Sequence, residues 1–298
     1  MALLQPVTPR ELHGRRKLEV FAPATLERLG EIEVASPEDV SAAVARARVA
    51  QVEWAARSFD ERERLHANLG IAGYGDDARL ARAAVREAGK TLLELPWVWL
   101  RPVDEVLARV RSVEGIEHVR AAHARGNGIV FLTPHLGCFE VAAQFAGSHG
   151  PITVMFRPPR QPALRPLLET GRRRGNVALV PANTRGATAL LAALRRGEWV
   201  GILPDQVPTG GEGEWAPFFG RPAFTMTLAT RLIERTGASA LMVVCERLPR
   251  GRGWTIRIEP LALPAPDESA TAAMNRALEA AIRRRPEQYL WSYHRYRT

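Results

Sequence analysis

Residues 128–140 read GIVFLTPHLGCFE, and this stretch decides how the rest of the chain is interpreted. Its first part, Ile129–Leu132, is a short apolar run between turn-forming residues, which is typical of a buried strand. From Cys138 to Ser148 the apolar spacing predicts a helix. A buried strand followed directly by a helix indicates an α/β protein.

The same alternation continues to the C-terminus. Further strands are predicted at residues 152–156, 177–180, 200–203, 240–245 and 254–258. Further helices are predicted at residues 163–174, 187–196, 225–236 and 269–285. Strands that alternate with helices predict an α/β fold with a mixed, largely parallel sheet flanked by helices.

The first 75 residues differ in character, and we expect them to form a helical N-terminal extension. Alternating segments from Leu18 to Val34 suggest a hairpin-like element. Ser36-Pro37-Glu38-Asp39 is a typical helix start, and helices are predicted at residues 36–57 and 60–69. Three glycines within residues 70–75 predict a linker. The expected division is therefore an extension of residues 1–75 and a domain of residues 76–298.

The 298-residue chain is strongly basic, with a formal net charge of +9 and a sequence pI of about 10.6. Nearly all of this charge is arginine, since Lys17 and Lys90 are the only lysines. Guanidinium groups suit phosphate, so one interpretation is an anionic partner; the other is compositional bias. The sequence has no helix-turn-helix and no aromatic-basic RNA motif, so we predict no nucleic-acid partner.

Membrane contact is expected to be peripheral. No stretch approaches the ~18 apolar residues that a membrane span needs, and residues 1–10 do not resemble a secretory signal. Cys138 and Cys245 are too few for a disulfide framework or a multi-cysteine zinc site, and they fit a reducing compartment.

His135 is the strongest candidate for catalysis. It follows the Ile129–Leu132 strand, and ligands of open α/β sheets bind beyond the carboxyl ends of strands. An imidazole can take the proton of a hydroxyl nucleophile. Glu140 should lie about one turn into the next helix, where its carboxylate can reach back and orient the imidazole. A histidine and a glutamate five residues apart can also be merely structural, and a Cys138–His135 nucleophile is a further alternative, although small apolar packing suits Cys138 better.

Five blocks of this sequence occur in a characteristic order. They are TPHLGCFE (133–140), ITVMFRPPR (152–160), GILPDQVP (201–208), WAPFFGRPA (215–223) and PEQYLW (286–291). The first resembles the His-x-x-x-x-acid motif of glycerolipid acyltransferases. Together they resemble the late acyltransferases of lipid A biosynthesis, the lauroyl/myristoyl transferase group, over roughly residues 78–298.

The resemblance implies a reaction and a place for it. The donor would be an acyl group on acyl carrier protein, and the acceptor would be a hydroxyl of an anionic glycolipid, a lipid A precursor. His135 would be the general base with Glu140 as its orienting partner, and no metal, cofactor or covalent acyl-enzyme is needed. The enzyme would work at the cytoplasmic face of the inner membrane.

Five further residues are candidates for substrate binding. Arg157 follows a predicted strand and should face the same edge of the sheet as His135, where it could bind phosphate. Arg160 and Arg185 are weaker candidates; all three could instead be solvated surface arginines. Asp205 and Gln206 could order the acceptor loop or orient an arginine, or could form a capped turn. The run at residues 172–174 reads as a helix end with favourable dipole contacts.

The N-terminal region departs from the family pattern. In place of an apolar anchor segment, residues 18–65 resemble the N-terminal segment of aldehyde dehydrogenases. The nucleophilic cysteine and cofactor domain of those enzymes have no counterpart, so we predict no oxidoreductase activity. Two alternatives to the leading function stay open. One is acyl transfer to a lysophospholipid or a phosphatidylinositol mannoside. The other is a non-catalytic, basic membrane-binding protein.

Overall fold

The structure is a computed structural model that describes residues 10–12, 15–21, 28–33, 36, 38, 41, 62–159, 165–208 and 212–296. The chain divides into two compact units, Met1–Asp60 and Glu61–Thr298. In the first unit, β1 (Arg10–Leu12), β2 (Arg15–Phe21) and β3 (Arg28–Glu33) form an antiparallel sheet. The β2–β3 pair is the predicted hairpin-like element. Most of the helix predicted at residues 36–57 lies outside the described residues.

The second unit begins with two helices, at residues 62–71 and at α2 (Ala78–Leu100). The side chain of Asp77 caps α2 by accepting hydrogen bonds from the backbone N–H groups of Arg79 and Leu80. Leu65 and Leu69 are buried in the core of this unit. The helix at residues 62–71 therefore packs with the α/β domain. Among the helices that the structure describes, none is both long and apolar enough to span a membrane.

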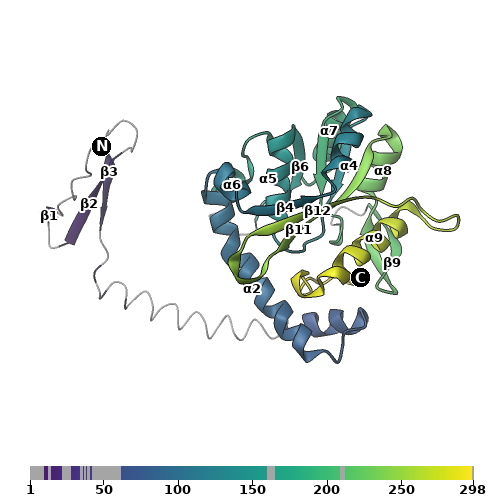
Figure 1. The fold of residues 1–298 in the computed structure, drawn as a ribbon, viewed down its shortest axis with the longest axis horizontal. Coiled ribbons are helices and arrows are strands. Elements are labelled where there is room, and N and C mark those ends of the chain that lie inside the picture. The colour runs from purple at the N-terminus through teal and green to yellow at the C-terminus, as the bar shows by residue number, and fades with distance from the viewer. Residues whose placement is uncertain are drawn as a thin grey trace. The chain divides into compact units, whose positions relative to one another are not determined.

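A seven-stranded sheet forms the centre of the second unit (Figure 1). Its strands follow one another in the order β4-β12-β11-β5-β8-β6-β7. Its antiparallel pair is β11–β12, and its other neighbours pair in parallel, so the sheet is mixed and largely parallel as predicted. The strands are β4 (Val110–Glu114), β5 (Ile129–Leu132), β6 (Ile152–Phe156), β7 (Val177–Pro181), β8 (Trp199–Ile202), β11 (Ser239–Arg247) and β12 (Trp254–Pro260).

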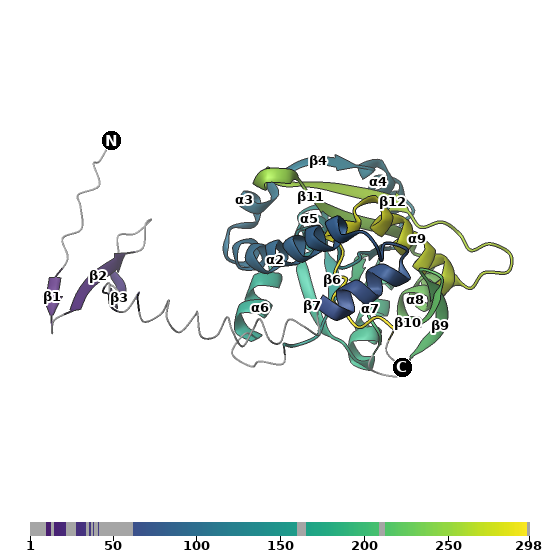
Figure 2. The same cartoon turned by 90° about the horizontal axis from the view of Figure 1, so that it is seen from below.

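Helices cover both faces of this sheet, which explains why its central strands are apolar without interruption. In β5, Ile129 and Phe131 enter one core, and Val130 and Leu132 enter the other. The first core is closed by α3 (Val103–Leu107), α4 (Ile116–Ala124), α5 (Phe139–His149) and α6 (Arg165–Arg172). The second is closed by α7 (Thr184–Arg195), α8 (Leu228–Thr236) and α9 (Ala270–Arg284). Figure 2 looks onto α2, which lies beside α6.

The predicted strands and helices after residue 128 all occur, with ends that differ by a few residues. Some features were not predicted. Before residue 128 these are the short helices α3 and α4 and the strand β4, which adds an edge strand to the sheet. After residue 128 the hairpin of β9 (Gly213–Phe218) and β10 (Arg221–Met226) was not predicted, so that Thr225 pairs in a strand and α8 begins only at Leu228.

Candidate active site

His135 is held at the carboxyl edge of the sheet, just beyond β5, by a chain segment from the other end of the sequence. Its carbonyl accepts a hydrogen bond of 3.0 Å from the backbone N–H of Leu290, and the next residue, Leu136, forms a β-bridge with Tyr289. These contacts follow the short helix η3 (Pro286–Gln288). The C-terminal PEQYLW block thus fixes the backbone of the His135 loop.

Gly137 lets this loop lie flat against β11. It has a φ of 60°, and a Cβ atom there would stand 2.1 Å from the carbonyl oxygen of Cys245. The backbone N–H of Cys138 donates to the same carbonyl at 2.9 Å. The need for glycine therefore comes from packing against the protein's own backbone.

Asp205 binds the imidazole of His135 from the neighbouring strand. Its Oδ1 lies 2.8 Å from His135 Nδ1, and its Oδ2 accepts the His135 backbone N–H at 2.9 Å. Because β5 and β8 are adjacent and parallel, the residues that follow them meet at one edge. An ionised carboxylate only accepts hydrogen bonds, so Nδ1 carries the proton and Nε2 keeps its lone pair.

The ionised form of Asp205 is favoured although the side chain is only 1% exposed. Burial by itself raises the pKa of this carboxyl, but electrostatic attraction to His135 and the hydrogen bonds from its ring and backbone lower the pKa by more, so the net shift is downward. The Asp205 charge acts in turn on Tyr289: burial, and then this neighbouring carboxylate, raises the pKa of the Tyr289 phenol well above its usual value. Tyr289 thus stays protonated beside Asp205.

Gln206 lies on the opposite side of the imidazole. Its Nε2 is 3.2 Å from His135 Nε2, which fits donation of the amide N–H to the free lone pair of the ring. The Phe139 ring lies edge-on to the imidazole at a centroid distance of 5.0 Å. The imidazole is thus held on three sides, and its basic nitrogen is the atom that Gln206 covers.

Glu140 is not the carboxylate that holds the imidazole in this structure. Both of its oxygens accept hydrogen bonds from Arg172, the last residue of α6. The guanidinium lies 5.7 Å from the ring centre of Trp99 and 5.2 Å from that of Phe156, within the range of cation–π contact. Glu140 is the second residue of α5, which directs its side chain toward α6, while the Nδ1 partner comes from Asp205.

Arg172 was not predicted as a site residue, because the run of arginines at residues 172–174 is typical of a helix end with favourable dipole contacts. Its side chain instead joins Glu140 in the wall of a cavity of about 280 Å³ at the carboxyl edge of the sheet. His135, Arg157 and Gln206 also line this cavity. Most of the remaining wall is apolar, from Phe139, Ala143, Val154, Met155, Phe156, Val177, Leu179, Ala182, Ile202, Leu203, Val207, Pro208 and Met226.

The three candidate arginines are placed differently. Arg157 follows β6 and lines the cavity with His135, as predicted from the shared sheet edge. Arg185 is exposed in the first turn of α7, after β7, and does not line the cavity. Arg160 lies outside the described residues. The structure therefore brings together His135, Glu140, Arg157, Asp205 and Gln206.

Cys138 does not form a nucleophile with His135. Its side chain is 2% exposed, and burial, followed by nearby Cys245 and Glu94, raises the pKa of the thiol well above its usual value. A buried, protonated thiol is a poor nucleophile. Cys138 packs in the core with Val141 and Cys245, as its small apolar character predicted.

A second polar layer lies behind the His135 loop and was not predicted. Arg247 is buried at the end of β11, donates to the Gly137 carbonyl at 3.2 Å, and pairs with Glu87 and Glu94 of α2 at 2.8 Å each. The Gln288 side chain bonds the backbone N–H and C=O of Arg247 at 2.8 and 2.9 Å. No local sequence pattern marks this layer, because its members lie up to about 200 residues apart in the chain.

Comparison with known proteins identifies the family of this chain. The family model of bacterial lipid A biosynthesis acyltransferases matches residues 37–298. The lipid A biosynthesis palmitoleoyltransferase of Escherichia coli (strain K12) is 30% identical over 72% of this chain and 70% of its own length. The lauroyltransferase of the same organism is 30% identical over 70% of this chain and 69% of its own. The myristoyltransferase is 26% identical over 64% and 60%. The chain therefore belongs to the bacterial lipid A biosynthesis acyltransferase family, and it is an acyltransferase.

Proposed function

We propose that the protein moves a fatty acyl chain from acyl carrier protein to a hydroxyl group of a lipid A precursor, with His135 as the general base. The named activities of the relatives support a lipid A-type acceptor. The observation that carries the proposal is the His135–Asp205 pair at the wall of the cavity. It leaves an imidazole nitrogen able to accept a proton beside a largely apolar space.

In the reaction, the acceptor hydroxyl displaces Gln206 from His135 Nε2 and gives its proton to that nitrogen as its oxygen attacks the acyl thioester carbon. The Nδ1–H donates to Asp205 throughout, so the imidazolium forms beside a fixed negative charge. When the tetrahedral intermediate collapses, the C–S bond breaks and the proton passes from Nε2 to the departing thiolate. The products are an ester and a free thiol, and His135 returns to its starting state.

Glu140 takes part through Arg172. The bidentate pair places a guanidinium, held over Trp99 and Phe156, on the wall of the cavity that contains His135. Arginine held in this way is rigid, and its charge is only partly screened by solvent. We assign Glu140 as the residue that positions Arg172 near the reacting groups.

Arg157, Arg185 and Arg160 are proposed to bind the phosphates of the acceptor. Arg157 lines the cavity directly. Arg185 lies in the first turn of α7, where backbone N–H groups add to the attraction for anions. A phosphorylated glycolipid bound here would direct its acyl chains toward the apolar wall.

The enzyme is proposed to work as a peripheral protein at the cytoplasmic face of the inner membrane. Support comes from α2, where the side chains of Val85, Leu92, Leu93 and Leu100 are 40%, 63%, 80% and 63% exposed. Trp215 in β9 is 55% exposed, and tryptophan is enriched at membrane interfaces. Binding to vesicles that contain anionic lipid, measured by sedimentation, should weaken when Leu92 and Leu93 are both replaced by Asp.

Direct transfer tests the proposal. Purified protein is mixed with acyl carrier protein that carries an acyl chain and with a tetra-acylated lipid A precursor, and the product is read by mass spectrometry. We expect a gain of one acyl group, which His135→Ala abolishes. His66→Ala is the matched control, because His66 is exposed on the helix at residues 62–71.

The alternatives give different results. Transfer to a lysophospholipid or a phosphatidylinositol mannoside, but not to the lipid A precursor, would replace the acceptor and keep His135 as the base. If the folded protein binds vesicles but transfers no acyl group to any acceptor, the result favours a non-catalytic, membrane-binding protein.

A further inference from the structure

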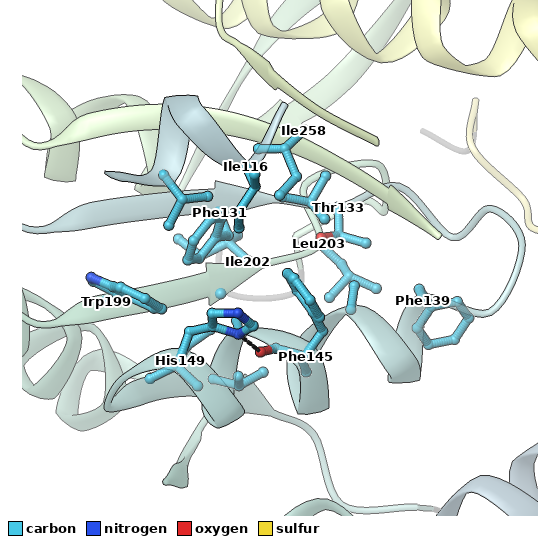
Figure 3. A pocket seen from close by; sticks show the side chains of 18 residues that line it. Ile116, Phe131, Thr133, Phe139, Phe145, His149, Trp199, Ile202, Leu203 and Ile258 are labelled. Carbon is cyan, nitrogen blue, oxygen red and sulfur yellow. Dashed lines mark hydrogen bonds between the residues drawn. The ribbon is translucent and has the colours of Figure 1, made fainter. Parts of the chain in front are cut away.

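We infer that the donor acyl chain lies in a channel between α5 and the sheet, and that Trp199 closes the far end of this channel and limits chain length. This inference rests on the proposed function, since it names the part of the protein that selects the acyl group. It concerns a second cavity, separate from the wall that bears Arg157 and Arg172 (Figure 3).

The second cavity is enclosed by α4, α5 and strands of the sheet. Its lining is almost entirely apolar; Thr133 stands at one end and His149 at the other. Ile116 of α4 and Ile258 of β12 form one side, and Phe145 of α5 forms the opposite side (Figure 3). A lining with so few polar groups excludes a sugar or a phosphate and suits a hydrocarbon chain.

The second cavity shares part of its wall with the His135 cavity. Both are lined by Phe139, Ala143, Val154, Ile202 and Leu203. Phe139 also touches the imidazole, with its ring centre 5.0 Å away. An acyl group whose carbonyl carbon lies at His135 can therefore pass its tail between Phe139 and Leu203 into the channel.

Trp199 closes the channel because its ring is held on several sides. It is the first residue of β8, so it lies at the amino end of the sheet, opposite the reacting groups. The ring meets Phe131 at 5.5 Å and His123 at 5.9 Å, both edge-on, and is 4% exposed. A ring packed in this way cannot turn aside for a longer chain without loss of these contacts.

The channel's length predicts a medium-length acyl chain. From Leu203 to Trp199 the strand takes four residue steps of ~3.3 Å, about 13 Å in all. A C–C bond of ~1.5 Å advances an extended chain by roughly 1.3 Å, so about ten carbons cover this distance. The cavity is narrow, about 40 Å³, and the chain must displace side chains to enter. Phe145 and Leu203 are only half-buried and can move outward.

The test compares donors that carry saturated chains from octanoyl to stearoyl. The wild type should prefer decanoyl and lauroyl over palmitoyl donors. Trp199→Ala should shift the preference toward longer chains. The rate of transfer from the longer donor, relative to the shorter one, should rise by about fourfold for each additional CH₂ that becomes buried. Gly201→Ala should shift it toward shorter chains, because the new Cβ would lie 3.2 Å from Val154 Cγ2, midway along the channel.

Trp254→Ala is the matched control for lost volume. Trp254 is buried in the same core, 5% exposed, but does not line the channel. Trp254→Ala should lower the melting temperature as Trp199→Ala does, but it should leave the ranking of donors by chain length unchanged.

A second readout keeps this inference separate from the identity of the acceptor. Free fatty acids of the same lengths are added, and their effect on the melting temperature of each variant is measured. If the wild type transfers no acyl group to lipid A precursor but its fatty-acid ranking shifts in Trp199→Ala, the channel stands and the acceptor is wrong. The inference is overturned if wild type, Trp199→Ala and Gly201→Ala rank the chain lengths identically, both as acyl donors and as bound fatty acids.

Discussion

Asp205 binds His135 at two points, the ring nitrogen Nδ1 at 2.8 Å and the backbone N–H at 2.9 Å. One carboxylate thus fixes both the loop that carries the imidazole and the tautomer of the ring. The pair is joined by adjacent parallel strands, so its geometry depends on the sheet and not on the short motif around His135.

Asp205→Asn should lower the rate of acyl transfer by a factor on the order of 10³ to 10⁴. The amide oxygen can still accept one hydrogen bond, but an NH₂ group facing Nδ1 favours the tautomer that protonates Nε2. The rate constant should fall with little change in KM for either substrate. A matching circular dichroism spectrum is required, and near-normal transfer by folded Asp205→Asn would remove Asp205 from the mechanism.

The stability of the protein should depend on Asp205 in acid. The pKa of this carboxyl is lower in the folded protein than in the unfolded chain. Its contribution is therefore fully present above the unfolded pKa of about 3.9 and is lost as the pH falls toward the lower, folded value. The difference in free energy of unfolding between wild type and Asp205→Asn, measured with urea, should shrink below about pH 4. A difference that stays constant from pH 6 to pH 3 contradicts this assignment.

Removal of Arg172 should destabilise the fold as well as the site. Glu140 is 7% exposed, and Arg172→Ala leaves this carboxylate buried without its partner. The free energy of unfolding should fall by about 3 kcal/mol. This is the lower end for a broken buried ion pair, because the Arg172 side chain is 27% exposed. Urea denaturation of Arg172→Ala, Glu140→Gln and the double variant measures the coupling.

The double variant provides the control for this pair. It should be more stable than Arg172→Ala alone, since no uncompensated charge remains. If the loss in free energy of unfolding of the double variant equals the sum of the losses of the two single variants, Glu140 and Arg172 do not stabilise one another.

Arg157→Ala should weaken binding of a phosphorylated acceptor by about 10- to 100-fold, seen as a higher KM. The same variant should behave like wild type toward an acceptor whose phosphates have been removed. Arg185→Ala, outside the cavity, should have a smaller effect. An equal loss with both acceptors would show that Arg157 acts on the structure of the site and not on phosphate.

Gly137→Ala should prevent stable folding of the His135 loop. A left-handed backbone costs alanine roughly 1–2 kcal/mol, and here the added Cβ would also lie 2.1 Å from the Cys245 carbonyl. Gly126→Ala separates the two effects, because Gly126 has a φ of 75° and open space around its Cβ direction. Thermal denaturation should show a much larger loss for Gly137→Ala than for Gly126→Ala.

Much of the domain could be predicted because its strands and helices are marked by patterns within short stretches of the sequence. The apolar run at Ile129–Leu132, the helix spacing after Cys138 and the alternation that follows determine a largely parallel sheet. Parallel strands end at one edge, and this places His135, Arg157 and Asp205 together without knowledge of any contact. The edge strand β4 was missed because its polar residues lack the apolar signal of a central strand. The resemblance of residues 18–65 to aldehyde dehydrogenases stays a prediction.

The sequence by itself determined the fold class, the family and the edge of the sheet at which the reaction is proposed to occur. Only the tertiary structure decided which carboxylate faces the imidazole: helix geometry turns Glu140 toward Arg172, and strand adjacency brings Asp205 to His135. It likewise decided that Arg172 lies in the site and that Trp199 lines a second, apolar cavity. Periodicity in a sequence reports which face of an element is buried, whereas side-chain partners depend on how separate elements pack against one another.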